Sequence, residues 1–105
     1  MFAIVSAGIA MNVDDYVVDV LMRDLIGHDH QPTSFLIYLW FTYEAGRVRR
    51  ERVYASYQTV ADAIGISKSA AQLGVRWLVR RKLLEATKTA PTAVPGYRVM
   101  RPWRR

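Results

Sequence analysis

Two side chains in the second half of the chain, Gln72 and Arg76, are of the types that recognise nucleic-acid bases. The amide of glutamine can form two hydrogen bonds with the edge of adenine, and the guanidinium of arginine can form two with guanine. Their four-residue spacing places both on one face if the segment is helical. This spacing predicts a pair of base-reading side chains on one helix.

The rest of that helical face has the same character. It comprises Lys68, Ser69, Gln72, Leu73, Arg76 and Arg80, and no acid interrupts it. Lys68 and the hydroxyl of Ser67 or Ser69 suit phosphates and nearby bases, and Leu73 could touch a thymine methyl group. The alternative is that this face is only the solvated side of a core helix.

Other chemistry is poorly supported by the sequence. His28 and His30 with Asp24 and Asp29 could bind a metal, but they lie in a polar connector beside a proline and no further cluster of ligands completes a shell. A glycine-rich phosphate loop, a nucleophile elbow and paired carboxylates are all absent from the sequence. We therefore expect no enzyme activity, no metal and no cofactor, and no small-molecule ligand is evident.

The charge is divided unevenly along the 105 residues, whose net charge is +6. Residues 1–46 contain six acids and one base, whereas residues 47–105 contain fourteen bases and three acids. Such an asymmetry indicates a polyanionic partner for the C-terminal part. A well-solvated basic surface without a partner is the simpler alternative.

The chain contains no cysteine, which excludes disulfides and thiolate metal sites and suits a reducing compartment such as the cytoplasm. The apolar run at residues 1–11 lacks the basic start of a signal peptide and is too short to span a bilayer. We interpret it as an edge strand, a frayed arm or the result of a start codon assigned too early, and we expect no membrane association.

Two helices are predicted in the first half. Asn12 with Asp14 and Asp15 marks the start of a helix over 13–26, which Gly27 ends. Thr33 or Ser34 caps a second helix over 35–45, closed by Gly46. The second helix is apolar nearly all round, so it is either central to the core or covered by a second subunit. We favour a homodimer through helices 13–26 and 35–45.

The second half predicts two short helices and three extended segments. Residues 52–54 form a short strand or link, Ser56 caps a helix over 57–64, and Ser67 caps a helix over 68–82 after a turn at Gly65. Ala61 is expected where the two helices approach most closely, and Ile66 fills the angle between them. The core-facing residues of the helix over 68–82 are Ala71, Gly74, Val75 and Leu78. Strands over 83–88 and 96–101 follow, joined by a proline-containing loop. Two helices joined in this way have the geometry of a helix-turn-helix.

The segment from Tyr54 to Gln72, with Leu78 and the run Arg81-Lys82-Leu83-Leu84, resembles the bacterial winged helix-turn-helix domains of small transcriptional regulators and plasmid replication initiators. The resemblance covers residues 33–103. Two positions depart from the pattern: Lys82 replaces the usual glycine after the recognition helix, and Leu73 with Gly74 makes an unusual recognition surface. The resemblance implies a wing along the minor groove or backbone, with Lys88, Thr89 and Arg98 as its candidate contacts.

The resulting prediction is a mainly α fold with a small β wing. Residues 1–32 form an N-terminal arm and accessory helix, and residues 33–105 form a winged helix-turn-helix domain. The predicted function is sequence-specific binding of double-stranded DNA by a dimeric transcriptional regulator. The predicted DNA contacts are Ser56, Tyr57, Ser67, Lys68, Ser69, Gln72, Arg76, Arg80, Lys88 and Arg98. The alternatives are a protein-interaction module and the DNA-binding component of plasmid replication initiation.

Overall fold

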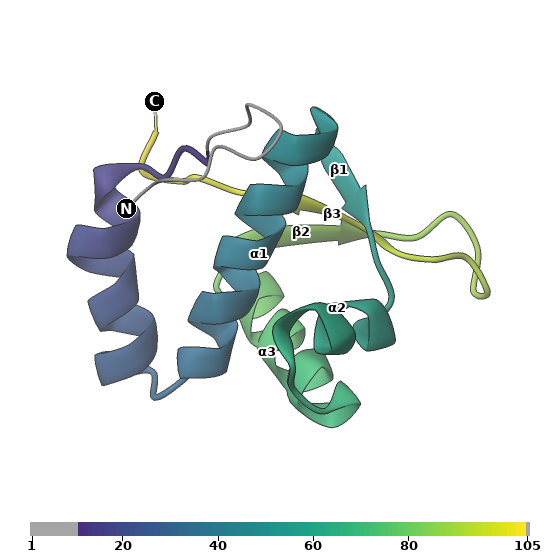
Figure 1. Ribbon diagram of the computed structural model, residues 1–105, viewed down its shortest axis with the longest axis horizontal. Helices are drawn as coiled ribbons and strands as arrows, with labels where there is room; N and C mark the ends of the chain where they lie inside the picture. The colour runs from purple at the N-terminus through teal and green to yellow at the C-terminus, as the bar shows by residue number, and fades with distance from the viewer. Residues whose placement is uncertain (1–10, 105) are drawn as a thin grey trace, which may run out of the picture.

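The helix α1 (Pro32–Val48) is the element around which the others pack. The computed structural model describes residues 11–104. Figure 1 shows α1 between the N-terminal helical segment and the pair α2 (Tyr57–Ile64) and α3 (Lys68–Arg80). The buried side of α1 includes Ile37, Tyr38 and Phe41, and the nearly all-round apolar pattern follows largely from this central position.

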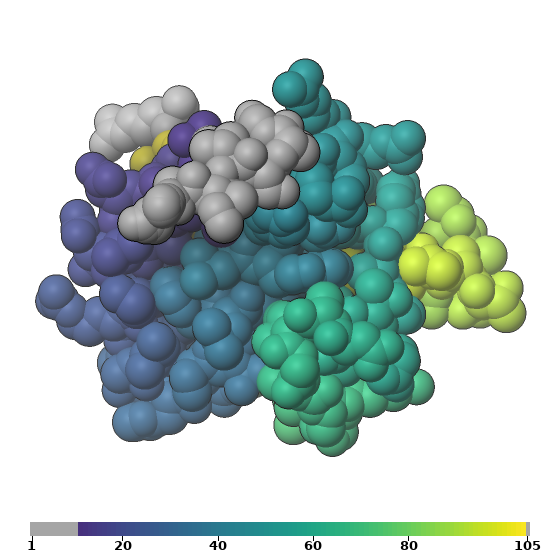
Figure 2. Space-filling model, in the orientation of Figure 1, coloured from purple at the N-terminus to yellow at the C-terminus, as the bar shows by residue number. Residues whose placement is uncertain are grey.

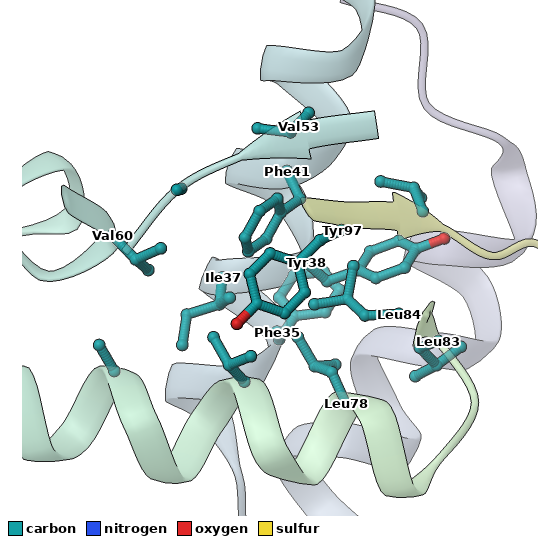
Figure 3. Close-up of a cluster of buried hydrophobic side chains, with 14 of the residues drawn as sticks. Phe35, Ile37, Tyr38, Phe41, Val53, Val60, Leu78, Leu83, Leu84 and Tyr97 are labelled. Atoms are coloured by element: carbon teal, nitrogen blue, oxygen red, sulfur yellow. The ribbon is translucent and has the colours of Figure 1, made fainter. Parts of the chain in front are cut away.

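A small antiparallel sheet completes the core. Its strands are β1 (Arg52–Tyr54), β2 (Leu84–Thr87) and β3 (Gly96–Val99), in the order β1-β3-β2. Alternate residues of these strands face α1, so that Tyr97 lies against Phe41 with ring centroids 5.1 Å apart (Figure 3). The loop between β2 and β3 projects from the body of the molecule (Figures 1 and 2). The predicted mainly helical class with a small β element is confirmed.

The turn between α2 and α3 forms as predicted. The Oγ atoms of Ser56 and Ser67 accept hydrogen bonds from the amides of Thr59 and Ala70, each at 3.1 Å. Gly65 has φ +88°, a left-handed conformation that side chains other than glycine adopt at a cost. These local interactions fix where each helix begins and where the first ends.

The tightest contact between helices lies where α3 crosses α1. A methyl group at Gly74 would overlap the end of the Ile37 side chain. Beside it, the buried hydroxyl of Ser34 donates a 3.1 Å hydrogen bond to the carbonyl of Gly74. The inward residues of α3, namely Ala71, Val75 and Leu78, are at most 1% exposed. This contact therefore sets which face of α3 remains open.

Several predicted ends were wrong. The helix expected over 35–45 begins at Pro32, which needs no amide partner at this position, and it continues through Gly46 to Val48. Neither Thr33 nor Ser34 caps it, because Gln31 takes that place. α3 ends at Arg80, and Lys82 then adopts φ +60°. The strands β2 and β3 are shorter than predicted, whereas β1 has the predicted bounds.

The predicted accessory helix is present, but most of it is π-helical. It comprises η2 (Val17–Leu21) and η3 (Arg23–His28). Gly27 does not end it, because the amide of Asp29 still bonds to the carbonyl of Asp24 at 2.8 Å. Val17, Leu21 and Leu25 are buried, and η3 contacts α1, as expected for an accessory helix packed on that helix. The predicted arm at residues 1–10 lies outside the described residues.

The C-terminal segment fastens this accessory helix to the core. Trp103 stacks on Tyr16 with ring centroids 4.6 Å apart, and its indole donates to Asp14 at 2.8 Å. Arg104 forms two further hydrogen bonds with the same carboxylate. These hydrogen bonds hold the pKa of Asp14 down at about 2. No helix within residues 11–104 is long and apolar enough to cross a membrane.

The crossing of α1 and α3 generates a paired stability prediction. Gly74→Ala should lower the free energy of unfolding by about 1 kcal/mol, because overpacking costs ~1–3 kcal/mol and exceeds the ~1 kcal/mol gain in helix propensity. Gly46 also lies within an α-helix, α1, but has open space around it. Gly46→Ala should therefore raise the free energy of unfolding by up to ~1 kcal/mol. Chemical denaturation measures both, and an equal gain in the two variants would contradict the close crossing.

The Asp14 carboxylate generates a pH prediction. Its folded pKa is depressed, so the stabilisation is present above the unfolded value of 3.8 and is lost as the pH falls through about 2. Asp14→Asn should therefore be less stable than the wild type at neutral pH, and the difference should shrink below about pH 4. Asp15→Asn changes the same charge at an exposed neighbour and is the control. Denaturant midpoints across pH 2–7 test this, and a pH-independent difference would argue against the ion pair.

Candidate nucleic-acid interface

The first turns of α2 and α3 carry the predicted hydroxyl contacts. Ser56 and Ser67 already accept capping hydrogen bonds. The Ser56 hydroxyl also lies 3.0 Å from that of Thr59, so one of these two donates to the other and one hydroxyl hydrogen of the pair remains for an outside acceptor. Ser67 and Ser69 lie with their oxygens 3.3 Å apart, so one of the two donates to the other and its partner keeps a free hydrogen. Together the pair can offer one hydroxyl donor to a phosphate beside the start of α3.

The outward face of α3 is the one predicted from the sequence. Lys68, Ser69, Arg76 and Arg80 are exposed, Leu73 is 66% exposed, and Gln72 is half-buried. Gln72 therefore has less freedom to reach a partner than Arg76, one turn further along. The open part of the face combines cations with one exposed aliphatic side chain.

A cavity of about 400 Å³ brings four of the predicted residues together. Its lining includes Ser56, Tyr57, Lys68 and Lys88, from the starts of both helices and the end of β2, together with Thr87 and Pro95. Tyr57 also lines an adjoining cavity of about 360 Å³ with Arg76 and Arg80. The α2–α3 pair and the β2–β3 hairpin thus form one continuous surface, which we call the α3–hairpin face.

The electrostatics of the α3–hairpin face are one-sided. Within the described residues, none of Lys68, Arg76, Arg80 and Lys88 forms an ion pair, and α3 itself carries no acid. Burial raises the pKa of Tyr97, whose ring lines both cavities, and the nearby Tyr57 raises it further. The phenol therefore stays neutral at physiological pH and adds no negative charge to this surface.

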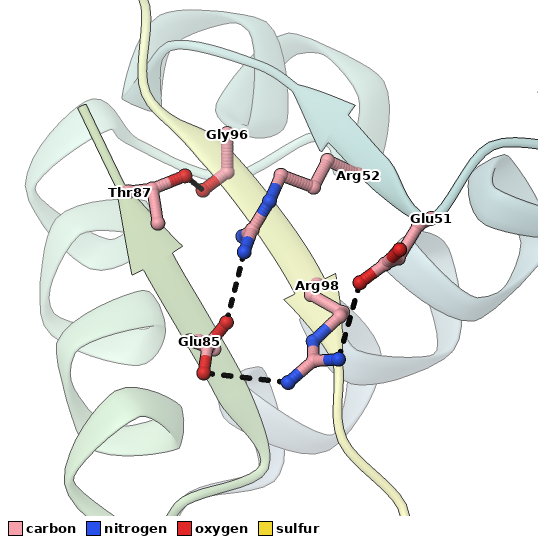
Figure 4. Close-up of polar contacts among 6 residues, drawn as sticks. All are labelled: Glu51, Arg52, Glu85, Thr87, Gly96 and Arg98. Carbon is pink, nitrogen blue, oxygen red and sulfur yellow. Dashed lines mark hydrogen bonds and ion pairs between the residues drawn. The ribbon is translucent and has the colours of Figure 1, made fainter. Parts of the chain in front are cut away.

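Arg98 lies apart from the other predicted contacts. It projects from β3 between the buried Tyr97 and Val99, on the face of the sheet that points away from the core. Figure 4 shows its guanidinium bonded to Glu51 at 3.1 Å and to Glu85 at 3.4 Å, where Glu85 also accepts from Arg52. The structure thus brings Arg98 into an ion-pair network and not into the α3–hairpin face.

The sequence reasoning missed a support for the end of α3. The buried carboxylate of Asp29 accepts from the Trp77 indole at 2.9 Å and lies 3.2 Å from Arg81 Nε. Burial alone would raise the pKa of Asp29, but the hydrogen bonds from His28 and Trp77 hold it below its usual value. Arg80 in turn lies 5.7 Å over the Trp77 ring. The sequence around Trp77 and Arg81 does not indicate that both contact Asp29, because Asp29 is distant in the sequence.

The two histidines of the connector do not converge. His28 bonds to Asp29 at 2.8 Å through Nδ1, whereas His30 is exposed with φ +57°. Across residues 11–104, no group of three or more histidine, aspartate or glutamate side chains is arranged to hold a metal ion. The connector instead contacts α3 through the hydrogen bond between Asp29 and Trp77.

Comparison with known proteins adds no relative: no family model, no curated protein and no solved structure matches this chain. The candidate function therefore depends on the residues and geometry described above.

Proposed function

We propose that this chain is a winged helix-turn-helix protein that binds double-stranded DNA without catalysis, as a small transcriptional regulator. The observation that carries the proposal is the α3–hairpin face, where four cations without carboxylate partners surround the exposed side of one helix. A surface of this kind attracts phosphates, because neutralising them releases the counterions condensed on DNA.

The order of elements supports a specific mode of docking. α3 follows a tight turn after α2, as the recognition helix of a helix-turn-helix does, and the projecting β2–β3 loop occupies the position of a wing. With α3 in the major groove, Arg76 reads guanine and the half-buried Gln72 reads a neighbouring adenine. Leu73 lies beside them and can contact a thymine methyl group.

The remaining contacts hold the backbone. Lys68 and Lys88 line one cavity with Ser56 and Tyr57, which offers two cations and two hydroxyl groups to phosphates between helix and hairpin. Arg80 extends the charge to the end of α3. The hairpin loop itself carries no charge between Thr89 and Pro95, so Lys88 at its base provides the charged contact there.

Substitution of Arg76 tests the proposal most directly. Arg76→Ala should weaken binding to the selected duplex by roughly 10- to 100-fold, because a bidentate contact with guanine is lost, and should relax the preference at one base position. Arg23→Ala removes the same charge from an exposed position on η3 and is the control. Selection from a random duplex library followed by anisotropy titrations measures both effects.

A second variant separates base reading from backbone contact. Lys88→Ala should weaken all duplexes alike and reduce the slope of affinity against salt by about one. If neither Arg76→Ala nor Lys88→Ala changes the affinity, the groove-binding mode is wrong and a protein-interaction module becomes the better hypothesis.

We further propose that the protein acts as a homodimer. Apolar side chains are exposed to solvent on both helices that we expect at the dimer interface, which we call the seam. Leu36 and Tyr43 of α1 are 49% and 43% exposed, and Val18 of η2 is 54% exposed. A two-fold dimer would place two α3 helices against half-sites about 34 Å apart.

Substitution of Leu36 tests the seam, because this side chain contributes little to the protomer core. We expect the wild type to sediment as a dimer and Leu36→Asp to sediment as a monomer with an unchanged circular-dichroism spectrum. The exposed Leu73→Asp on α3 is the matched control, and it should remain dimeric. A monomeric wild type at tens of micromolar would reject the seam.

A further inference from the structure

Five arginines line a third cavity, at the C-terminal end of α1. The cavity has a volume of about 470 Å³, and none of its lining residues belongs to α2 or α3. Its arginines are Arg47, Arg50, Arg98, Arg101 and Arg104, whereas Glu51 is the one acid in the described lining. This cavity is therefore separate from the α3–hairpin face.

Three of these guanidiniums are fixed by carboxylates. Arg47 forms two hydrogen bonds with Glu44, at 2.8 and 2.9 Å, and Arg104 does the same with Asp14. Arg98 is held by Glu51 and Glu85. Arginines oriented in this way lose little conformational entropy when a further acceptor arrives, because their side chains are already ordered.

The cluster nevertheless has more donors than acceptors. Arg50 and Arg101 have no carboxylate partner among residues 11–104. Arg52 Nη1 and Arg98 Nε are buried without a hydrogen-bond partner, and these two arginines face each other across neighbouring strands. Glu85 accepts a hydrogen bond from each of them, which offsets the repulsion between like charges on neighbouring strands. The arginines that remain available to an anion in the cavity are therefore Arg50 and Arg101.

We propose that this cavity is a binding site for a phosphate-bearing anion, with Arg50 and Arg101 as its main ligands. The guanidinium is suited to this chemistry because its fork of N–H donors matches two phosphate oxygens at once. A volume of about 470 Å³ falls in the range of small-molecule sites, ~300–1,000 Å³. The phosphate can belong to a free phosphorylated small molecule or to the backbone of a second duplex.

Calorimetry with inorganic pyrophosphate on the full chain at low ionic strength tests the site. We expect one pyrophosphate per chain, and Arg50→Gln/Arg101→Gln should weaken binding at least about tenfold, since two charge-assisted contacts are lost. Arg23→Gln/Arg49→Gln removes the same charge at exposed positions outside the cavity and should bind as the wild type does. Arg50→Gln and Arg101→Gln are also measured singly, so that the site can be tested even if the double variant does not fold.

Three results would overturn the proposal: no binding at low salt, equal weakening in both double variants, or weakening by Arg76→Gln on α3 instead. The first would show that the cavity does not bind the anion, the second that only general electrostatic attraction acts, and the third would place pyrophosphate on the α3–hairpin face. Because the readout is pyrophosphate, a failure of DNA binding leaves the test intact. Once the site is established, a duplex added to the loaded protein identifies the source: displacement indicates a DNA backbone, and retention indicates a small anion.

Discussion

The close crossing of α1 and α3 at Gly74 is the constraint on which the open surfaces of this molecule depend. A side chain at that position would overlap the end of the Ile37 side chain, so the packing between the two helices would have to change. The Ser34 hydroxyl satisfies a carbonyl at the same point, so a polar group can be buried there without an unmet hydrogen bond. With one side of α3 fixed against α1, its cations are forced to the opposite side.

The placement of the acids explains why the basic half remains unneutralised at α3. Two of them, Asp14 and Asp29, act as anchors for the C-terminal elements: Asp14 holds Trp103 and Arg104, and Asp29 holds Trp77 and Arg81. Glu51 and Glu85 are engaged by the arginines of the sheet. Among the described residues, carboxylates therefore pair with cations at the accessory helix, just beyond the end of α3 and on the sheet, and not on the open face of α3.

Features set by contacts between residues close in the sequence could be predicted, and features set by contacts between distant residues could not. The caps at Ser56 and Ser67 and the left-handed Gly65 depend on atoms within a few residues, and their positions were predicted correctly. The N-terminal helix continues past Gly27 to Asp29, which was not predicted, and the carboxylate of Asp29 meets Trp77, 48 residues away. Ser34 was expected at a helix cap for the same reason: its buried role depends on Gly74, 40 residues away.

The placement of Arg98 illustrates the same limit and suggests how the two basic surfaces act together. Strand alternation between the buried Tyr97 and Val99 already requires Arg98 to face away from the core, but only the register with Glu85 and Arg52 shows what it meets. α1 contacts α3 near Ser34 and lines the arginine cavity from Thr42 to Arg47, so one rigid helix connects both surfaces. An anion in the cavity can change DNA affinity only if it binds one arrangement of α1 and α3 better than another. Because the Gly74 crossing leaves little room for a second arrangement, we expect the two surfaces to bind independently.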